Sequence, residues 1–210
     1  GVKTQCEILN CTQRAIQTLL ERNVKALVLA CNTATAAAAK ELRAKLDIPV
    51  IGMEPALKPA HFLRHGGQIL VLATPATLHM EKFRHLMEQY GEGAVPVEGY
   101  GLVECIESGH VAPDDPQLLS VLHKLLDPHL DVKTDAVVLG CTHYVFAREA
   151  LRRIVPGAAL VDGNEGTVRQ LTRRLGENGA LEAEGEGGYE LHTSGGESIY
   201  LPLMEKLMSL

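Results

Sequence analysis

The chain has 210 residues, of which 46% are hydrophobic and 22% are charged, the balance of a globular protein rather than of a disordered, collagen-like or coiled-coil chain. Its 26 acidic residues outnumber 20 Lys and Arg residues that form no basic cluster, which argues against nucleic acid or an anionic membrane surface as the main partner. No apolar run approaches the roughly 18–20 residues of a membrane helix, and the odd number of cysteines, five, predicts a reducing, cytoplasmic compartment rather than a disulfide framework.

The first fifty or so residues predict two helices and two short strands. Thr4 and Glu7 have the spacing of a helix capping box, and apolar residues then recur at helical intervals as far as Leu20. Two short apolar runs are typical of buried strands, and the Ala-rich stretch between them is typical of a helix. We expect the strands at residues 25–30 and 48–52 and the helix at about residues 34–46.

The same alternation continues through the rest of the chain. We expect further strands at residues 68–73, 135–139 and 158–161, an alternating edge strand at residues 189–193, and helices that begin near residues 74, 116, 144 and 163. Strands that alternate with helices across short links are typical of the α/β class with parallel sheets. A Pro-rich seam at residues 55–59 and a turn near residue 163 are candidate crossings between domains.

Two segments of the chain share one pattern, and both centre on a cysteine. In residues 27–33 and again in residues 137–143, an apolar strand is followed by a small residue, a cysteine, polar residues and then a helix. Cys31 and Cys141 are therefore expected at the carboxyl ends of parallel strands, where open α/β sheets bind their ligands. Both are also expected at a helix N-terminus, where the helix dipole favours anions and can lower the pKa of a thiol.

The residues beside these cysteines suit a small carboxylate substrate. Asn32, Thr33 and Thr142 supply amide, hydroxyl and backbone donors. His143 lies two residues after Cys141 and can exchange a proton with it. Two cysteines that face each other across one cleft could remove a proton from one face of a carbon and return a proton to the other face. This pattern predicts epimerisation at an α-carbon without a cofactor.

Other interpretations of the cysteines stay open at this point. A cysteine after an apolar strand is often a small hydrophobic core residue. A metal site is disfavoured because the chain has no Cys-x-x-Cys pair, and a redox dithiol is disfavoured because the two cysteines lie far apart in the sequence. The other cysteines lack polar capping neighbours, and we expect them to be structural: Cys6, Cys11 and Cys105. No lysine stands beside a phosphate-binding glycine loop, so no pyridoxal phosphate site is expected.

The two cysteine segments also resemble a known family. Residues 30–35 (Ala-Cys-Asn-Thr-Ala-Thr) and 140–144 (Gly-Cys-Thr-His-Tyr) are similar to the cysteine motifs of the glutamate racemase family, in the cofactor-independent aspartate/glutamate racemase superfamily. Further similarities follow in order along the chain, at residues 51–55, 72–77, 103–104 and 160–163. Relative to that family the sequence lacks an N-terminal strand with an Asp-Ser-Gly turn, and it starts with Gly rather than Met. We therefore expect that residues upstream of this sequence were removed or are missing.

The resemblance implies an isomerase that interconverts L- and D-glutamate and supplies D-glutamate for peptidoglycan, and so for cell-wall biogenesis and cell shape. It assigns removal of the α-proton of the D isomer to Cys31 and of the L isomer to Cys141, with His143 assisting Cys141. It implies no cofactor and no metal, a small-molecule substrate as the partner, and a homodimer. The residues implied to contact the substrate are Gly1, Asn32, Thr33, Thr77, Glu104, Thr142 and His143.

The resemblance also implies two similar α/β domains with mainly parallel sheets and an active site in the cleft between them. The first domain would comprise residues 1–54 and 163–210, and the second would comprise residues 55–162, with Cys31 and Cys141 on opposite walls. Two alternatives remain, namely another racemase of the superfamily, such as aspartate racemase, and a non-catalytic amino-acid-binding protein. The Cys-Asn-Thr-Ala and Cys-Thr-His motifs favour glutamate as the substrate.

Overall fold

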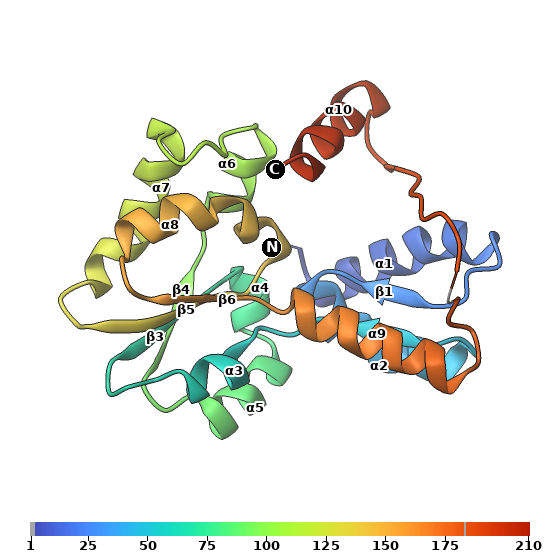
Figure 1. Ribbon diagram of the computed structural model, residues 1–210, viewed down its shortest axis with the longest axis horizontal. Coiled ribbons are helices and arrows are strands. Elements are labelled where there is room, and N and C mark those ends of the chain that lie inside the picture. The colour runs from blue at the N-terminus through green and yellow to red at the C-terminus, as the bar shows by residue number, and fades with distance from the viewer. Residues whose placement is uncertain (1–2, 183) are drawn as a thin grey trace.

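Two parallel β-sheets organise the part of the chain that the computed structural model describes, residues 3–182 and 184–210 (Figure 1). The first sheet pairs β1 (Leu27–Leu29) with β2 (Val50–Gly52) in parallel. The second sheet has the strand order β4-β3-β5-β6, and all of its pairs are parallel. Its strands are β3 (Gln68–Ala73), β4 (Ala94–Glu98), β5 (Thr134–Leu139) and β6 (Ala159–Val161).

A small apolar core and one threonine hold the first sheet to α1 (Gln5–Leu20) and α2 (Asn32–Lys45). A third helix, α9 (Asn164–Glu177), contacts β2. Leu29 of β1 and Ala38 of α2 are buried in the same apolar cluster. The buried hydroxyl of Thr35 donates to the Leu29 carbonyl at 3.1 Å and accepts from the Met53 amide at 2.9 Å. Thr35 thereby ties the first turn of α2, which directly follows Cys31, to both strands.

The second sheet is covered by helices on both faces (Figure 1). Ile69 and Val71 of β3 pack towards one face, and Leu70 and Leu72 pack towards the other, as the two-residue period of a strand requires. One face carries α3 (Leu57–Phe62) and α5 (Glu81–Tyr90), and the other carries α6 (Leu102–Glu107), α7 (Pro116–Leu126) and α8 (Arg148–Ile154). Because β3 is buried on both faces, its sequence is an almost continuous apolar run.

Short helices complete the second sheet at both ends of its strands. Directly after β3 comes α4 (Pro75–Leu78), and the 3-10 helix η2 (Thr142–Ala147) follows β5. A second 3-10 helix, η1 (Asp127–His129), precedes β5. Both α4 and η2 therefore begin at the carboxyl ends of the two central strands, which is the edge where the sequence predicts the site.

The predicted α/β class with parallel sheets is confirmed. The capping box of α1 is confirmed too, because the Thr4 amide donates to the Glu7 carboxylate at 2.8 Å and the Glu7 amide donates to the Thr4 hydroxyl at 3.4 Å. The strand at residues 68–73 has its predicted bounds. The strands predicted at residues 25–30, 48–52, 135–139 and 158–161 also form, and their observed bounds differ from the predicted ones only at the ends. The division of the chain into two domains remains a prediction.

Two local predictions need correction, and one strand was not predicted. The edge strand expected at residues 189–193 does not form; this segment pairs with no described strand, and Glu190 and His192 instead direct their side chains to Arg22. The helix expected from residue 144 begins earlier, as η2, and becomes α-helical only in α8. The sequence analysis also missed β4, whose Pro96 argues against a strand; β4 lies at the edge of the sheet, where proline is tolerated.

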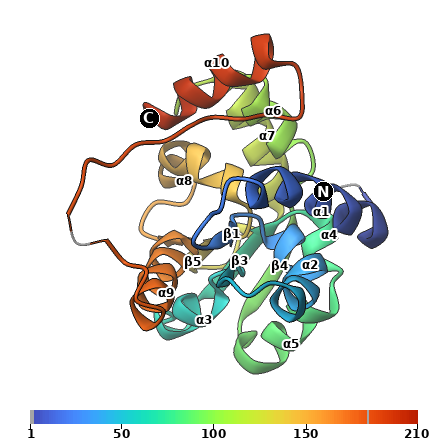
Figure 2. The same cartoon turned by 90° about the vertical axis from the view of Figure 1, so that its right-hand side faces the viewer.

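A segment whose described residues, 178–182 and 184–196, form no helix or strand precedes the last helix, α10 (Glu197–Met208), which lies beside α6 in Figure 2. Ion pairs between Lys25 and Glu182 and between Arg22 and Glu190 hold this segment near the end of α1. The Lys206 ammonium of α10 donates to the Gly109 carbonyl, just after α6, at 3.3 Å. None of the described helices, α10 included, is long and apolar enough to cross a membrane.

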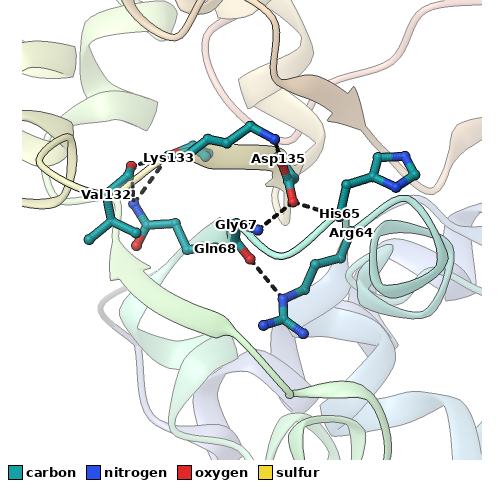
Figure 3. Close-up of polar contacts among 8 residues, drawn as sticks. Arg64, His65, Gly67, Gln68, Val132, Lys133 and Asp135 are labelled. Atoms are coloured by element: carbon teal, nitrogen blue, oxygen red, sulfur yellow. Dashed lines mark hydrogen bonds and ion pairs between the residues drawn. The ribbon is translucent and has the colours of Figure 1, made fainter.

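Asp135 lies near the start of β5, at the end of the second sheet opposite the cysteines, and its contacts are drawn in Figure 3. One of its carboxylate oxygens accepts hydrogen bonds from the amides of His65 at 2.6 Å and Gly67 at 2.7 Å, and the other pairs with the Lys133 ammonium at 2.8 Å. A Cβ at Gly67 would lie 2.6 Å from the Lys133 carbonyl, so only glycine fits this approach. The contacts fix the loop before β3 against the start of β5.

Asp135→Asn should make the stability of the protein less dependent on pH in acid. The hydrogen bonds to Lys133, His65 and Gly67 lower the pKa of Asp135 to about 2, below the roughly 3.9 of an unfolded aspartate. The carboxylate therefore stabilises the fold above about pH 4, and this contribution is lost as the pH falls towards 2. Urea unfolding between pH 2 and pH 6 measures the effect, with Asp131→Asn, at an exposed acid in the turn before β5, as the control. Equal pH dependence in wild type and Asp135→Asn would contradict it.

Candidate active site

Both cysteines of the repeated pattern lie where the sequence predicts, at the carboxyl ends of parallel strands. Cys31 follows β1 and caps α2, where its sulfur accepts a hydrogen bond from the Ala34 amide at 3.5 Å. Cys141 follows β5 and stands at the N-terminus of η2. The Cys31 side chain is exposed, whereas Cys141 is partly buried. The two cysteines thus occupy equivalent positions on different sheets but differ in their contact with solvent.

A single hydrogen bond joins the two cysteine turns directly. The Asn32 side-chain amide donates to the carbonyl of Gly140 at 2.6 Å. Asn32 is buried, and each partner is the immediate neighbour of a cysteine. Because Asn32 belongs to the first sheet's α2 and Gly140 follows the second sheet's β5, this contact connects the two sheets at the point where both cysteines lie.

Three threonine hydroxyls form a second link between the sheets. The Thr33 hydroxyl lies 2.8 Å from that of Thr77 and 3.2 Å from that of Thr74, and the last two lie 3.0 Å apart. All three side chains are buried. Each hydroxyl can both donate and accept, so the three satisfy one another in a closed set. The sequence analysis named Thr33 and Thr77 as site residues, whereas it missed Thr74.

Burial works against the thiolate form of Cys141. Desolvation raises the pKa of the Cys141 thiol to about 11; the negative charges of Cys31 and Glu107 act in the same direction, while a hydrogen bond from the His143 backbone amide opposes them. A helix N-terminus can lower the pKa of a thiol, but at Cys141 the pKa is raised, because desolvation outweighs the hydrogen bond from the His143 amide. Near neutral pH Cys141 is a neutral thiol. It can act as a base only after a neighbouring base has accepted its proton.

His143 stands between Cys141 and an acidic residue. Its Nδ1 lies 3.8 Å from the Cys141 sulfur, and its Nε2 lies 3.0 Å from the Glu107 carboxylate. The sequence analysis named His143 but missed Glu107. A signal was present, because Glu107 lies three residues after Glu104 and therefore on the same face of helix α6.

Known proteins share this chain's pattern over nearly its whole length. The family model described as Asp/Glu/Hydantoin racemase matches residues 6–171. The glutamate racemase of Clostridium perfringens is 43% identical over 215 residues, which cover 100% of this chain and 82% of that protein. The chain belongs to the Asp/Glu/hydantoin racemase family. Its membership makes the protein a racemase, a class of isomerase.

Solved structures of other racemases are similar to this one. Escherichia coli glutamate racemase, crystallised with L-glutamate and the activator UDP-MurNAc-Ala, has a TM-score of 0.82 at 29% identity, over 98% of this chain and 79% of that chain. Thermus thermophilus glutamate racemase, in complex with β-chloro-D-alanine, has a TM-score of 0.78 at 31% identity, over 98% of this chain and 77% of that chain. The arrangement of two parallel sheets is therefore shared with racemases of known structure.

The racemase brings most of the predicted site residues together, but not all of them. Thr142 is partly buried in the first turn of η2, beside Cys141. Glu104 is exposed on α6, and within the described ranges its side chain makes no recorded hydrogen bond or ion pair. Its negative charge contributes to raising the pKa of the buried Tyr144 hydroxyl, after desolvation and Cys141. Gly1 lies outside the described residues.

Little open space adjoins the two cross-sheet links of the racemase. A cavity of about 20 Å³ is lined by Asn32, Thr77 and Phe83, among others, which is room for a single water molecule. The side-chain oxygen of Asn32 is buried there without a partner in the described part of the chain. Among the described residues, no group of three or more His, Cys, Asp or Glu side chains is placed to hold a metal ion.

Tyr144 anchors η2 beneath the cysteine turn of the racemase. Its side chain is fully buried, and its hydroxyl donates to the Gly99 carbonyl at 3.2 Å. A Cβ at position 99 would lie 2.1 Å from that hydroxyl oxygen, so glycine is required after β4 for the tyrosine to fit. Gly140 is confined in the same way, because its Cβ would lie 2.7 Å from the Ala73 Cβ and 2.9 Å from the Leu72 carbonyl.

Gly140→Ala should destabilise the racemase by about 1–3 kcal/mol, the usual cost of overpacking, and should displace the Cys141 turn from Asn32. Gly166→Ala is the matched control, because a Cβ there meets no atom within 4 Å in the described residues and lies in helix α9. That control should be neutral or stabilising by about 0.4–1 kcal/mol. Denaturant unfolding measures both variants, and equal stability of the two would show that the Gly140 turn can relax without cost.

Proposed function

We propose that this racemase interconverts L- and D-glutamate with Cys31 and Cys141 as its two bases. The observation that carries the proposal is the Asn32–Gly140 hydrogen bond at 2.6 Å, which holds the two cysteine turns next to each other. The Clostridium perfringens relative at 43% identity is a glutamate racemase, which supports glutamate as the substrate.

The proposed chemistry needs only proton transfer. One cysteine, as thiolate, takes the α-proton from its face of the substrate, and the bonding electrons stay on the α-carbon. The thiol of the other cysteine then donates its proton to the opposite face, which inverts the configuration. Cys31 acts on the D isomer and Cys141 on the L isomer. No cofactor enters this sequence, because both transfers are made by side chains of the chain itself.

The substrate carboxylates would be bound by donors that now bond to each other. The hydroxyls of Thr33 and Thr77 are paired within the threonine set, and the Asn32 amide is paired with Gly140. The two hydroxyls can turn towards a carboxylate without being left unsatisfied, because the incoming oxygen replaces the present partner. The Asn32 amide keeps its bond to Gly140 and offers its second N–H to the substrate. In this proposal Thr142 adds a donor beside Cys141, and Glu104 on α6 contacts the substrate's ammonium group.

The proposal extends to the role of the product. D-Glutamate made by this reaction would supply peptidoglycan synthesis, and so cell-wall biogenesis and cell shape. We further propose a cytoplasmic homodimer with domains at residues 1–54 with 163–210 and at residues 55–162. Sedimentation of the purified protein tests the dimer, and limited proteolysis near residues 55 and 163 tests the division.

Replacing either cysteine should stop racemisation. Cys31→Ser and Cys141→Ser exchange a thiol for a hydroxyl, a far weaker acid, and each should lower the rate by about 10²- to 10⁴-fold. Circular dichroism of L-glutamate and of D-glutamate follows the reaction. Cys11→Ser is the control, because Cys11 is exposed on α1 and should keep the wild-type rate. Near wild-type racemisation by either site variant would reject the two-cysteine mechanism.

The substrate choice is tested against the alternatives in the same assay. The optical signal of L-glutamate should decay to zero, and that of L-aspartate should persist on the same time scale. Decay of L-aspartate alone would identify an aspartate racemase. A persistent L-glutamate signal together with saturable binding of glutamate would identify a non-catalytic binding protein.

A further inference from the structure

We propose that Arg148 is a positioning residue that keeps the Cys141 turn aligned with the Cys31 turn, because it fastens the start of α8 to the link between the two sheets. The inference rests on the proposed function, in which these cysteines are the two bases. Arg148 lies outside both cysteine motifs. It is the first residue of α8, which continues the η2 helix that begins beside Cys141.

The link between the sheets is the short segment that follows β6. β6 belongs to the second sheet, whereas α9, which begins at Asn164, contacts β2 of the first sheet. Figure 1 shows β6 leading into α9 on the side of the first sheet. Residues 162–163 therefore lie where the chain passes from one sheet to the other.

The Arg148 guanidinium bonds to two groups of this part of the chain at once. Its Nη1 donates to the Leu160 carbonyl at 3.0 Å, and its Nη2 pairs with the Asp162 carboxylate. The second oxygen of that carboxylate accepts a hydrogen bond from the Asn164 amide at 2.8 Å, at the start of α9. A guanidinium holds two acceptors in a fixed geometry because its donors form a rigid fork, which the ammonium of a lysine does not have.

The Arg148–Asp162 pair is less exposed than the other arginine pairs. The Arg148 side chain is 27% exposed and that of Asp162 is 18% exposed. Every other arginine–carboxylate pair recorded in the described ranges has at least one side chain that is 45% exposed or more. Water therefore screens this pair less than the others, and its loss should loosen the backbone segments that it joins.

The same link also lies against the first sheet. A Cβ at Gly163 would lie 3.3 Å from the Met53 side chain, just after β2. The Met53 amide donates to the Thr35 hydroxyl at 2.9 Å, and the Thr35 amide donates to the Cys31 carbonyl at 2.9 Å. A continuous series of contacts thus runs from Arg148, through the link, to the turn that carries Cys31.

The two cysteine turns are therefore joined by two routes. The direct contacts, the Asn32–Gly140 hydrogen bond and the threonine set, are gathered at the site. Contacts at one place leave the turns free to tilt about it, whereas a second connection along a separate path restrains the tilt. Racemisation by two bases depends on this restraint, because each sulfur must face the α-carbon from its own side and a misplacement of about 1 Å can lower a rate by about 10²-fold.

The test compares Arg148→Gln with two control variants. Arg152→Gln removes an arginine of the same helix whose ion pair with Glu149 is exposed. Asp135→Asn removes a stabilising carboxylate at the opposite end of the second sheet, so it lowers stability without touching the link. Arg148→Lys keeps the positive charge but loses the fork. Denaturant unfolding shows that each variant folds and how much stability it has lost.

The first readout separates removal of the α-proton from inversion. L-Glutamate is incubated in heavy water, and the deuterium in the recovered L-glutamate is compared with the D-glutamate formed. The Cys141 thiolate takes the α-proton, and its thiol exchanges that proton for a solvent deuteron. The deuteron returns to the same face of the α-carbon when Cys31 is not aligned to donate from the other face.

Arg148→Gln should lower kcat for racemisation by about 10- to 100-fold, with a smaller effect on KM because the donors to the substrate carboxylates remain. The ratio of exchange to inversion should rise by the same factor, because proton removal is retained while delivery from the opposite face is lost. Arg148→Lys should lie between Arg148→Gln and the wild type. Arg152→Gln and Asp135→Asn should keep the wild-type ratio.

The second readout needs no substrate. Iodoacetamide alkylates the cysteines of the free protein, and mass spectrometry gives the rate for each cysteine-containing peptide. Cys141 is partly buried and Cys31 is exposed, so Cys31 serves as the internal reference. Arg148→Gln should speed alkylation of Cys141 relative to Cys31 by about two- to fivefold, the range for loss of a partly exposed ion pair. Asp135→Asn should leave this relative rate unchanged.

The two readouts distinguish failure of this inference from failure of the proposed function. If the wild type racemises glutamate and Arg148→Gln keeps the wild-type ratio of exchange to inversion, or Asp135→Asn changes that ratio as much, the function stands and the inference is overturned. If the wild type does not racemise glutamate, the proposed function falls and alkylation decides the inference. Faster alkylation of Cys141 in Arg148→Gln alone then supports the positioning role, and an unchanged rate rejects it.

Discussion

The hydrogen bond from the Asn32 amide to the Gly140 carbonyl is the contact on which the arrangement of the site depends. At 2.6 Å it joins the turn after β1 to the turn after β5, and these turns belong to different sheets. Asn32 is buried, so loss of one partner would leave the other unsatisfied, at a cost of about 1–3 kcal/mol. The three threonine hydroxyls support the same crossing. Together these contacts hold two cysteines near each other that the sequence separates widely.

The two cysteines occupy equivalent turns, yet their surroundings differ. Cys31 is exposed at the start of a regular helix, whereas Cys141 is partly buried at the start of a 3-10 helix. Burial favours the neutral thiol, and the His143–Glu107 pair lies beside that thiol alone. The difference follows from the neighbouring elements, because α6 and Tyr144 enclose the second turn.

Much of the site could be predicted because parallel sheets bring the ends of their strands to one edge. Cys31, Asn32 and Thr33 follow β1 directly, and Cys141, Thr142 and His143 follow β5 directly, so their common location follows from topology. Glu107 and Thr74 could not be assigned in this way. Glu107 lies on a helix that no cysteine motif includes, and Thr74 reaches the site only through its contacts with Thr33 and Thr77.

The sequence by itself determined the α/β class, the capping box of α1, the central strand β3 and the two cysteine turns, because each depends on periodicity or on contacts between residues close in the chain. The tertiary structure alone decided the raised pKa of Cys141, the partner of His143 and the pairing of Asn32 with Gly140. The tertiary structure also decided that residues 189–193 form no strand and pair with no described strand. Desolvation, strand pairing and contacts between distant residues depend on what the folded chain places nearby, and no local pattern encodes those neighbours.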